Sequence, residues 1–189
     1  MIWLGGVLIH AWIYYEKKIL ICTFLFISSS CYSEEGTTYY LIRHAEKLRV
    51  DLRNQNPTLN HQGVKRADAW KVVFSNVSLD AVYSTDYNRT KLTAKPTADS
   101  KHLPIFLYNP KEMYSESFQH KTKGKSVLVV GHSNTTHVFA NKVLGRDEYN
   151  QIHDDNNSNL YIVSVINGKA SSILLKINWG QFLLNFSQP

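Results

Sequence analysis

Hydrophobic positions follow two distinct spacings along the chain after residue 36. Residues 39–42 form a short run of aromatic and branched aliphatic side chains, which is typical of a buried strand. Residues 60–77 place apolar side chains three and four positions apart, as in an amphipathic helix packed on a sheet. The same criteria predict strands at 80–83, 104–108 and 126–130, and helices at 89–98, 111–123 and 134–144.

This alternation of strands and helices predicts an α/β domain. We expect a three-layer sandwich with a largely parallel central sheet flanked by helices on both faces. Two further strands, at 159–166 and 171–177, are predicted to close the domain as a hairpin, because the Asn167-Gly168 pair between them favours a tight turn.

Local signals refine the ends of two predicted helices. Pro96 is expected to kink the helix at 89–98 or to end it early, because proline lacks a backbone N–H. In the helix at 134–144, Ser133 or Asn134 is suited to cap the N-terminus and Gly145 to end the C-terminus.

Residues 1–31 differ in composition from the rest of the chain. The pair Lys17-Lys18 precedes nine apolar or near-apolar residues, 19–27, and then a run of three serines, which is the pattern of a secretory signal peptide. A stretch of nine residues is too short to span a bilayer, which requires about 20. We therefore expect a signal peptide, a lipoprotein leader or a membrane anchor at 1–31, a spacer at 32–36 and the folded domain at 37–189.

Cys31 resembles the processing site of a bacterial lipoprotein, although Ser28 occupies the position where leucine is usual. The expected location is therefore the periplasm or cell envelope, with lipid attachment at Cys31 as one form of membrane association. The apolar residues 1–15 indicate either an upstream start or the first half of an uncleaved anchor. The alternative is a buried N-terminal helix of a cytosolic protein.

Composition excludes several classes of protein. The net charge is +6, but the basic residues are spread along the chain rather than grouped in an arm, so we expect no nucleic-acid binding. An anionic substrate explains the charge equally well. Both cysteines, Cys22 and Cys31, lie in the N-terminal segment, which excludes a disulfide framework and a Cys-ligated zinc site in the domain itself.

Chemistry-bearing residues follow three of the predicted strands. Arg43 and His44 follow the first, Ser84-Thr85 ends the second with Arg89 one helical turn later, and His132 follows the strand at 126–130. Ligands of open α/β sheets bind at the carboxyl ends of the strands. Arginine binds phosphate with paired N–H groups, and neutral imidazole is a nucleophile near pH 7. The sequence therefore predicts a phosphoryl-transfer pocket that needs no metal or other cofactor.

Two metal-binding alternatives are weaker. His44-Ala45-Glu46 matches half of a zinc deaminase motif, but the cysteine pair that this motif requires is missing from the domain. The acidic segment 154–157 resembles a calcium loop, but it lacks the glycine and the distal glutamate of an EF-hand and is interpreted as a solvated turn. His137 and His153 are interpreted as surface residues.

Three motifs together resemble the histidine phosphatase superfamily, whose fold is phosphoglycerate mutase-like: Arg43-His44-Ala45-Glu46-Lys47, Ser84 to Thr90, and Val130 to Thr135. The resemblance implies that His44 is a nucleophile that becomes phosphohistidine. It also implies that Arg43, Arg89 and His132 bind the phosphoryl group. The short segment between residues 108 and 126 resembles the compact, cap-poor members that act on phosphorylated proteins or exposed sugar phosphates, so mutase activity is not expected.

The general acid is the least defined residue of this site. Ser133 follows His132, where some family members have a carboxylate, and Glu112 and Glu116 are the remaining candidates. The expected function is a phosphomonoesterase acting on a small phosphorylated molecule or a phosphoprotein. The alternatives are a catalytically idle member that binds phosphorylated ligands in the cell envelope, and a metal-dependent hydrolase that uses the histidines.

Overall fold

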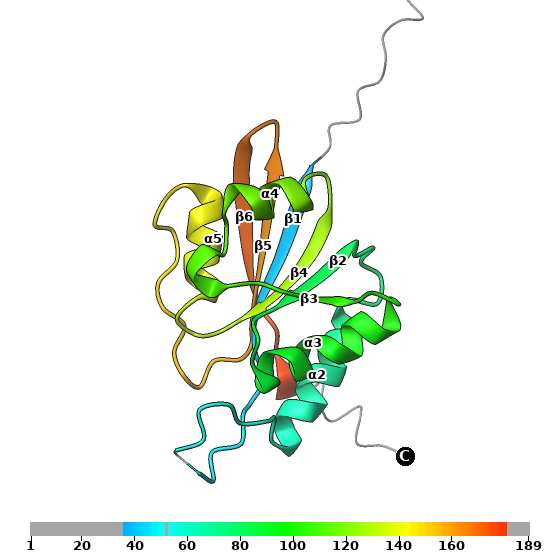
Figure 1. Cartoon of the computed structure of the whole chain (residues 1–189), viewed down its shortest axis with the longest axis vertical. Helices are drawn as coiled ribbons and strands as arrows, with labels where there is room; N and C mark the ends of the chain where they lie inside the picture. The colour runs from blue at the N-terminus through cyan, green and yellow to red at the C-terminus, as the bar shows by residue number, and fades with distance from the viewer. Residues whose placement is uncertain (1–35, 52, 181–189) are drawn as a thin grey trace, which may run out of the picture. The chain divides into compact units, whose positions relative to one another are not determined.

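The structure, a computed structural model, describes residues 36–51 and 53–180 (Figure 1). All of them belong to the second of the two units into which the chain divides, Glu35–Pro189. The segment 1–31, predicted to be a leader, lies outside the described residues. Within the described ranges, no helix combines the length and apolar character needed to cross a bilayer.

A mixed sheet of six strands forms the centre of the domain, in the order β3-β2-β4-β1-β5-β6. The first four of these pair in parallel, and β5 and β6 add an antiparallel hairpin beside β1. The strands are β1 (Thr37–Arg43), β2 (Ala81–Ser84), β3 (Ile105–Leu107), β4 (Ser126–Gly131), β5 (Asn159–Ile166) and β6 (Lys169–Lys176).

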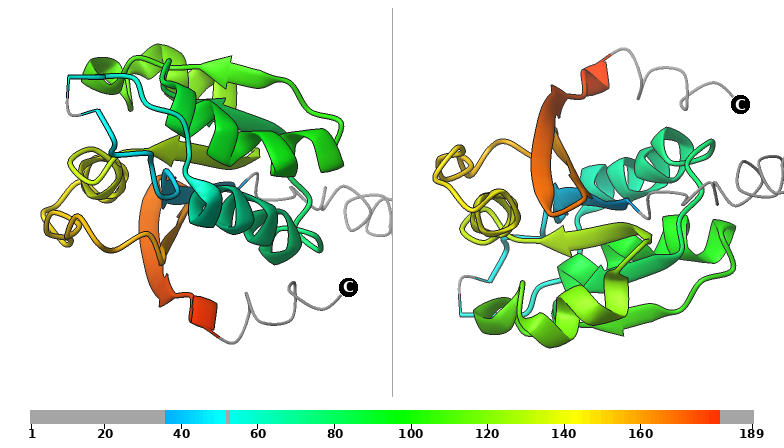
Figure 2. Two further views of the ribbon diagram at one scale, coloured as in Figure 1. Left: turned by 90° about the horizontal axis from the view of Figure 1, so that it is seen from below. Right: turned by 90° about the horizontal axis from the view of Figure 1, so that it is seen from above.

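Helices cover both faces of this sheet, which confirms the predicted three-layer α/β architecture (Figure 2). The helices α2 (His61–Val73) and α3 (Asn88–Ser100) pack on one face, and α4 (Glu116–Thr122) and α5 (Thr136–Leu144) pack on the other. The central strands are apolar at successive positions because both of their faces are covered. In β4, for example, Val127 and Val129 belong to one core cluster and Leu128 and Val130 to the other.

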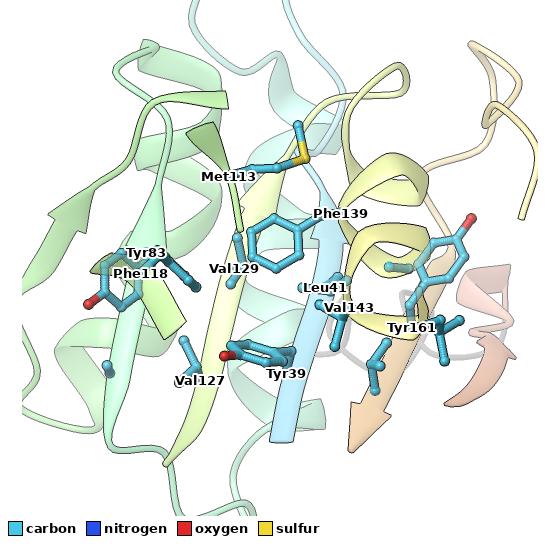
Figure 3. Packing of buried hydrophobic residues seen from close by; sticks show 14 of the residues in the cluster. Tyr39, Leu41, Tyr83, Met113, Phe118, Val127, Val129, Phe139, Val143 and Tyr161 are labelled. Carbon is cyan, nitrogen blue, oxygen red and sulfur yellow. The ribbon is translucent and has the colours of Figure 1, made fainter. Parts of the chain in front are cut away.

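Aromatic side chains fill the core on the α4–α5 face. Figure 3 shows Phe139 of α5 beside Tyr39 and Leu41 of β1. The ring of Phe139 lies 5.9 Å from that of Tyr39 and 5.4 Å from that of Phe118, between centroids. All four side chains are at least nine-tenths buried, and burial of each contributes roughly 1.5–3 kcal/mol. This packing fixes α4 and α5 on the sheet.

One predicted helix is wrong, and one of the two effects expected of Pro96 does not occur. The predicted helix at 111–123 is broken into a 3₁₀ turn, Pro110–Glu112, and the short α4, because Ser115 is extended and its hydroxyl accepts a hydrogen bond from Phe118 N–H to start a new helix. Pro96 does not end α3, which continues to Ser100. Burial of Ala94 and Ala98 against the sheet offsets the hydrogen bond that proline cannot donate.

The N-terminus of α5 also differs from the prediction. The helix begins after Thr135, and neither Ser133 nor Asn134 caps it. Instead the Thr135 hydroxyl accepts a hydrogen bond from the backbone N–H of His132, at 3.0 Å. The predicted end of α5 is confirmed, because Gly145 adopts the left-handed conformation with φ of 68°. The β5–β6 turn is also confirmed, since Asn167 and Gly168 both have positive φ.

The start of α2 is fastened to the segment that follows β1. The Asn60 side chain accepts a hydrogen bond from Gly63 N–H, which caps the helix. Gly63 packs so closely on the backbone that a Cβ atom there would lie 2.2 Å from the carbonyl oxygen of Glu46. This contact holds α2 beside the residues that follow His44.

Replacement of Gly63 by alanine should destabilise the domain, although alanine normally favours a helix over glycine by about 1 kcal/mol. The new methyl group would meet backbone atoms that no side-chain rotation can move, so we expect the free energy of unfolding to fall by about 2–3 kcal/mol. Urea denaturation measures this change. Lys65→Ala, at an exposed position of the same helix, should be nearly neutral. An increase in stability of Gly63→Ala would contradict the close contact.

Candidate functional site

The register of the parallel strands places the predicted site residues at one edge of the sheet. Arg43, the last residue of β1, lies opposite Gly131, the last residue of β4. Ser84, the last residue of β2, lies opposite Val130. The histidines that follow β1 and β4 therefore meet. The ring centroids of His44 and His132 are 5.4 Å apart, with an angle of 67° between the ring planes.

His44 is held by its backbone on both sides. Its N–H donates to the carbonyl of Gly131 at 2.9 Å, and its carbonyl accepts from the side-chain amide of Asn157 at 2.7 Å. The ring atom Nδ1 lies 2.7 Å from the carbonyl oxygen of Ala45. Because a carbonyl only accepts, Nδ1 carries the proton and the lone pair of the neutral ring is on Nε2.

Burial keeps this imidazole neutral. Removal from water lowers the pKa of His44 to about 3, against the effect of the hydrogen bond to Ala45, and the positive charges of Arg43 and Arg89 and the proximity of His132 lower it further. A neutral ring whose Nδ1 is occupied presents Nε2 as a nucleophile at neutral pH.

His132 is oriented by two polar partners. Its Nε2 lies 2.9 Å from the hydroxyl of Thr85, and its Nδ1 lies 3.4 Å from Nη2 of Arg89. A guanidinium only donates, so Nδ1 accepts and Nε2–H donates to Thr85. The Thr85 hydroxyl in turn lies 2.9 Å from that of Thr90. Burial, and then Arg89, Arg43 and Lys47, lower the pKa of His132 to about 4.

Arg89 lies at the start of α3 between an aromatic ring and a loop. Its guanidinium carbon is 4.4 Å from the ring centroid of Tyr87, and its Nη1 donates to the carbonyl of Gln55 at 3.3 Å. Its Nε atom is buried and has no hydrogen-bond partner among the described residues. A buried N–H without an acceptor is suited to an anion at this place.

Arg43 is bound to the protein itself more tightly than the sequence indicates. Its Nη1 donates to the carbonyls of His153, Asp154 and Asn156, and its Nη2 contacts the Asp154 carboxylate at 2.6 Å. Only Nε lacks a partner among the described residues. Burial lowers the pKa of Arg43, and Asp154 opposes that effect. Arg43 therefore both fastens the loop before β5 and retains one N–H for a ligand.

The loop at 153–157 supports two residues of the candidate site, a role that sequence reasoning missed. The predicted solvated turn is confirmed for Asp154 and Asp155, which are exposed. Asn157, however, is 6% exposed and supports His44, while Asp154 pairs with Arg43. One signal was available. This loop precedes a strand that runs antiparallel to β1, so it starts at the edge where β1 ends.

A cavity of about 330 Å³ opens beside His44. Its walls come from the segment after β1, the start of α2 and the loop before β5, and include Arg43, Lys47, Arg49 and Asp154. Within residues 36–51 and 53–180, no group of three or more histidine, cysteine or acidic side chains is arranged to hold a metal ion.

The family model for the histidine phosphatase superfamily (branch 1) matches residues 39–109. Solved structures extend the likeness to most of the chain. YhfR from Bacillus stearothermophilus has a TM-score of 0.61 at 16% identity and covers 75% of this chain and 98% of that protein. The protein histidine phosphatase SixA complexed with tungstate has a TM-score of 0.60 at 13% identity and covers 79% and 99%.

Alpha-ribazole phosphatase from Shigella flexneri has a TM-score of 0.56 at 12% identity and covers 74% of this chain and 96% of that protein. Among curated proteins, none matches the sequence. The predicted resemblance is confirmed: this chain has the histidine phosphatase fold. The four residues that the family motifs predicted, Arg43, His44, Arg89 and His132, lie together in that fold, at the carboxyl ends of β1, β2 and β4.

The two candidate acids of this histidine phosphatase fold lie elsewhere. Glu112 ends the 3₁₀ turn and Glu116 begins α4; both are exposed, and neither lines the cavity beside His44. The carboxylates that do line it are Glu46, Asp154 and Asp155. Glu46 is bound by both the Nε and the Nη2 of the buried Arg66.

Stability should depend on pH through the two site histidines. Their pKa values in the folded protein, about 3 and about 4, lie below the ordinary histidine value of about 6.5, so the unfolded chain takes up protons first as the pH falls. The free energy of unfolding should therefore decrease from pH 6.5 towards pH 4.

The free energy of unfolding should fall less in His132→Gln than in the wild type when the pH is lowered from 7 to 4.5. We expect the difference between the two decreases to be roughly 2 kcal/mol. Denaturant titrations at both pH values measure this effect. The control is His120→Gln, at an exposed position of α4, which should retain the wild-type dependence. Equal pH dependence of all three proteins would show that His132 is not held neutral by the fold.

Proposed function

We propose that this protein is a phosphomonoesterase in which Nε2 of His44 attacks phosphorus and forms phosphohistidine. One observation carries the proposal: a neutral histidine with Nδ1 fixed on a carbonyl faces a second histidine that is itself bound to Arg89. Phosphoryl transfer needs a nucleophile in line with the leaving oxygen and fixed positive charge around the other oxygens. The site supplies both.

In the first step the bond from Nε2 of His44 to phosphorus forms, and the bond from phosphorus to the leaving oxygen breaks. Arg43 and Arg89 each contribute the buried Nε–H that has no partner among the described residues, and His132 orients the Arg89 guanidinium through the hydrogen bond to its own Nδ1. In the second step water attacks the phosphohistidine, releases inorganic phosphate and restores neutral His44. The proposed chemistry uses no metal.

The substrate is proposed to be a small phosphorylated molecule or a phosphoprotein. Support comes from the fold that the chain shares with SixA, a protein histidine phosphatase, and with alpha-ribazole phosphatase. The cellular location is likewise a proposal, and it rests on the sequence alone. A signal peptide or anchor at 1–31, with lipid attachment at Cys31, would place the domain in the periplasm or cell envelope.

Hydrolysis of 4-nitrophenyl phosphate in the presence of a chelator tests the nucleophile directly. Its leaving group needs little protonation, so the assay does not depend on the identity of the acid. We expect His44→Ala to lower kcat by about 10³-fold or more, because the nucleophile is lost. His120→Ala, the matched exposed histidine, should remain active. Full activity of His44→Ala, or loss of wild-type activity on chelation, would contradict the mechanism.

One observation favours a second candidate function, a member of the fold that binds phosphorylated ligands without turnover. Four hydrogen bonds of Arg43 go to the loop at 153–157, and neither Glu112 nor Glu116 lines the cavity. An alkyl phosphate, whose leaving oxygen must be protonated, separates the two candidates. If the protein is an enzyme with its own proton donor, 2-hydroxyethyl phosphate should be hydrolysed at a measurable rate. Binding of that ester with no phosphate release would indicate the ligand-binding function.

A further inference from the structure

The cavity beside His44 extends away from the second histidine. Neither Arg89 nor His132 lines it, so its far walls belong to the segment after β1 and to the loop before β5. A phosphoryl group at His44 would therefore place the rest of the substrate against these walls. The side chains of the walls then decide which leaving group fits, and two of them, Lys47 and Arg49, are basic.

Lys47 is a half-buried cation on the wall of this cavity. No ion pair of its ammonium occurs among the described residues. The nearest carboxylate in sequence, Glu46, is bound by the buried Arg66 and is therefore committed. Partial burial and then the charges of Arg49 and Arg89 lower the pKa of Lys47, and the Asp154 carboxylate opposes this effect.

Arg49 is held beside this cation by Asp154. Its Nη2 contacts Oδ2 of Asp154 at 2.8 Å, while Oδ1 of the same carboxylate contacts Arg43. One carboxylate thus bridges two guanidinium groups at the cavity wall. Arg49 is 54% exposed and uses a single nitrogen in this contact, so its other N–H groups remain for a ligand.

We propose that the cavity selects small phosphate monoesters that carry a second anionic group, a carboxylate or another phosphate, which Lys47 and Arg49 bind. This inference rests on the proposed function, because it takes His44 as the phosphoryl site. A cavity of about 330 Å³ is at the small end of the range for small-molecule ligands and suits a metabolite-sized ester. Asp154 and Asp155 carry two negative charges against the three positive charges of Arg43, Lys47 and Arg49 on the wall, and Glu46 is committed to Arg66, so the wall keeps a positive charge for a second anion.

Binding of two phosphonates tests this specificity without requiring turnover. 3-Phosphonopropionate and propylphosphonate are similar in size, but only the first has a carboxylate, and neither can be hydrolysed. Isothermal titration calorimetry with the full chain should give a Kd about tenfold lower for 3-phosphonopropionate, which corresponds to about 1.4 kcal/mol. The advantage should shrink as salt is added, because the carboxylate contact is exposed at one side.

Lys47→Ala and Arg49→Ala should each reduce the ratio of the two Kd values to about threefold or less. Arg146→Ala is the matched control. Arg146 is 55% exposed and paired with Glu148, much as Arg49 is paired with Asp154, but it does not line the cavity. This control should retain the wild-type ratio.

The outcomes separate the inference from the proposed function. Equal Kd values for the two phosphonates in the wild type, or a ratio unchanged in both cavity variants, would overturn the second anion site even if 4-nitrophenyl phosphate is hydrolysed. A preserved ratio without any hydrolysis would support the site and reject the enzyme. A peptide that carries phosphoserine between uncharged residues provides a further comparison. If it binds more tightly than 3-phosphonopropionate, the cavity is assigned to protein substrates and the proposed class of small substrates is overturned.

Discussion

The parallel pairing of β1 with β4 is the constraint on which the site depends. Its register ends with Arg43 opposite Gly131, and the next N–H along the chain, that of His44, donates to the carbonyl of Gly131. This one bond sets the backbone of His44, the proposed nucleophile, against the strand that delivers His132. A shift of one residue would turn every buried side chain of β1 to the other face of the sheet and separate the two histidines. The core on both faces therefore determines the geometry of the site.

The electrostatic environment then determines the protonation state of the two histidines that the strand register brings together. Burial, and then the charges of two neighbouring arginines, make the charged form of each imidazole unfavourable, so both rings remain neutral where an exposed histidine would begin to titrate. A site that is positive only through its arginines can attract an anion without protonating its nucleophile. The hydrogen bonds to Ala45 and Thr85 complete the arrangement, because they select the tautomer of each ring.

A feature of the fold or of the candidate site could be predicted only where it leaves a pattern of residue types in the sequence. The strands and most helices carry periodic signals, and the site residues sit at the ends of those strands, so His44, Arg89 and His132 were identifiable. The contact of Arg43 with the loop at 153–157 has no such signal, because it joins residues 110 or more positions apart through backbone carbonyls. Carbonyls are common to all residue types, so composition cannot reveal them. The break in the predicted helix 111–123 was equally hidden, since it depends on one extended serine.

The binding of Arg43 by the loop at 153–157 bears on the proposed phosphate pocket. A guanidinium that is bound at both terminal nitrogens has lost its rotational freedom before any ligand arrives, so the entropy of ordering it is not lost again on binding. The N–H that remains, on Nε, then has a fixed direction. Arg89 has the same character, because its ring stacking and its bond to Gln55 leave Nε without a partner among the described residues. The contacts that occupy the other nitrogens of Arg43 and Arg89 therefore preorganise two donors for the proposed phosphate ligand.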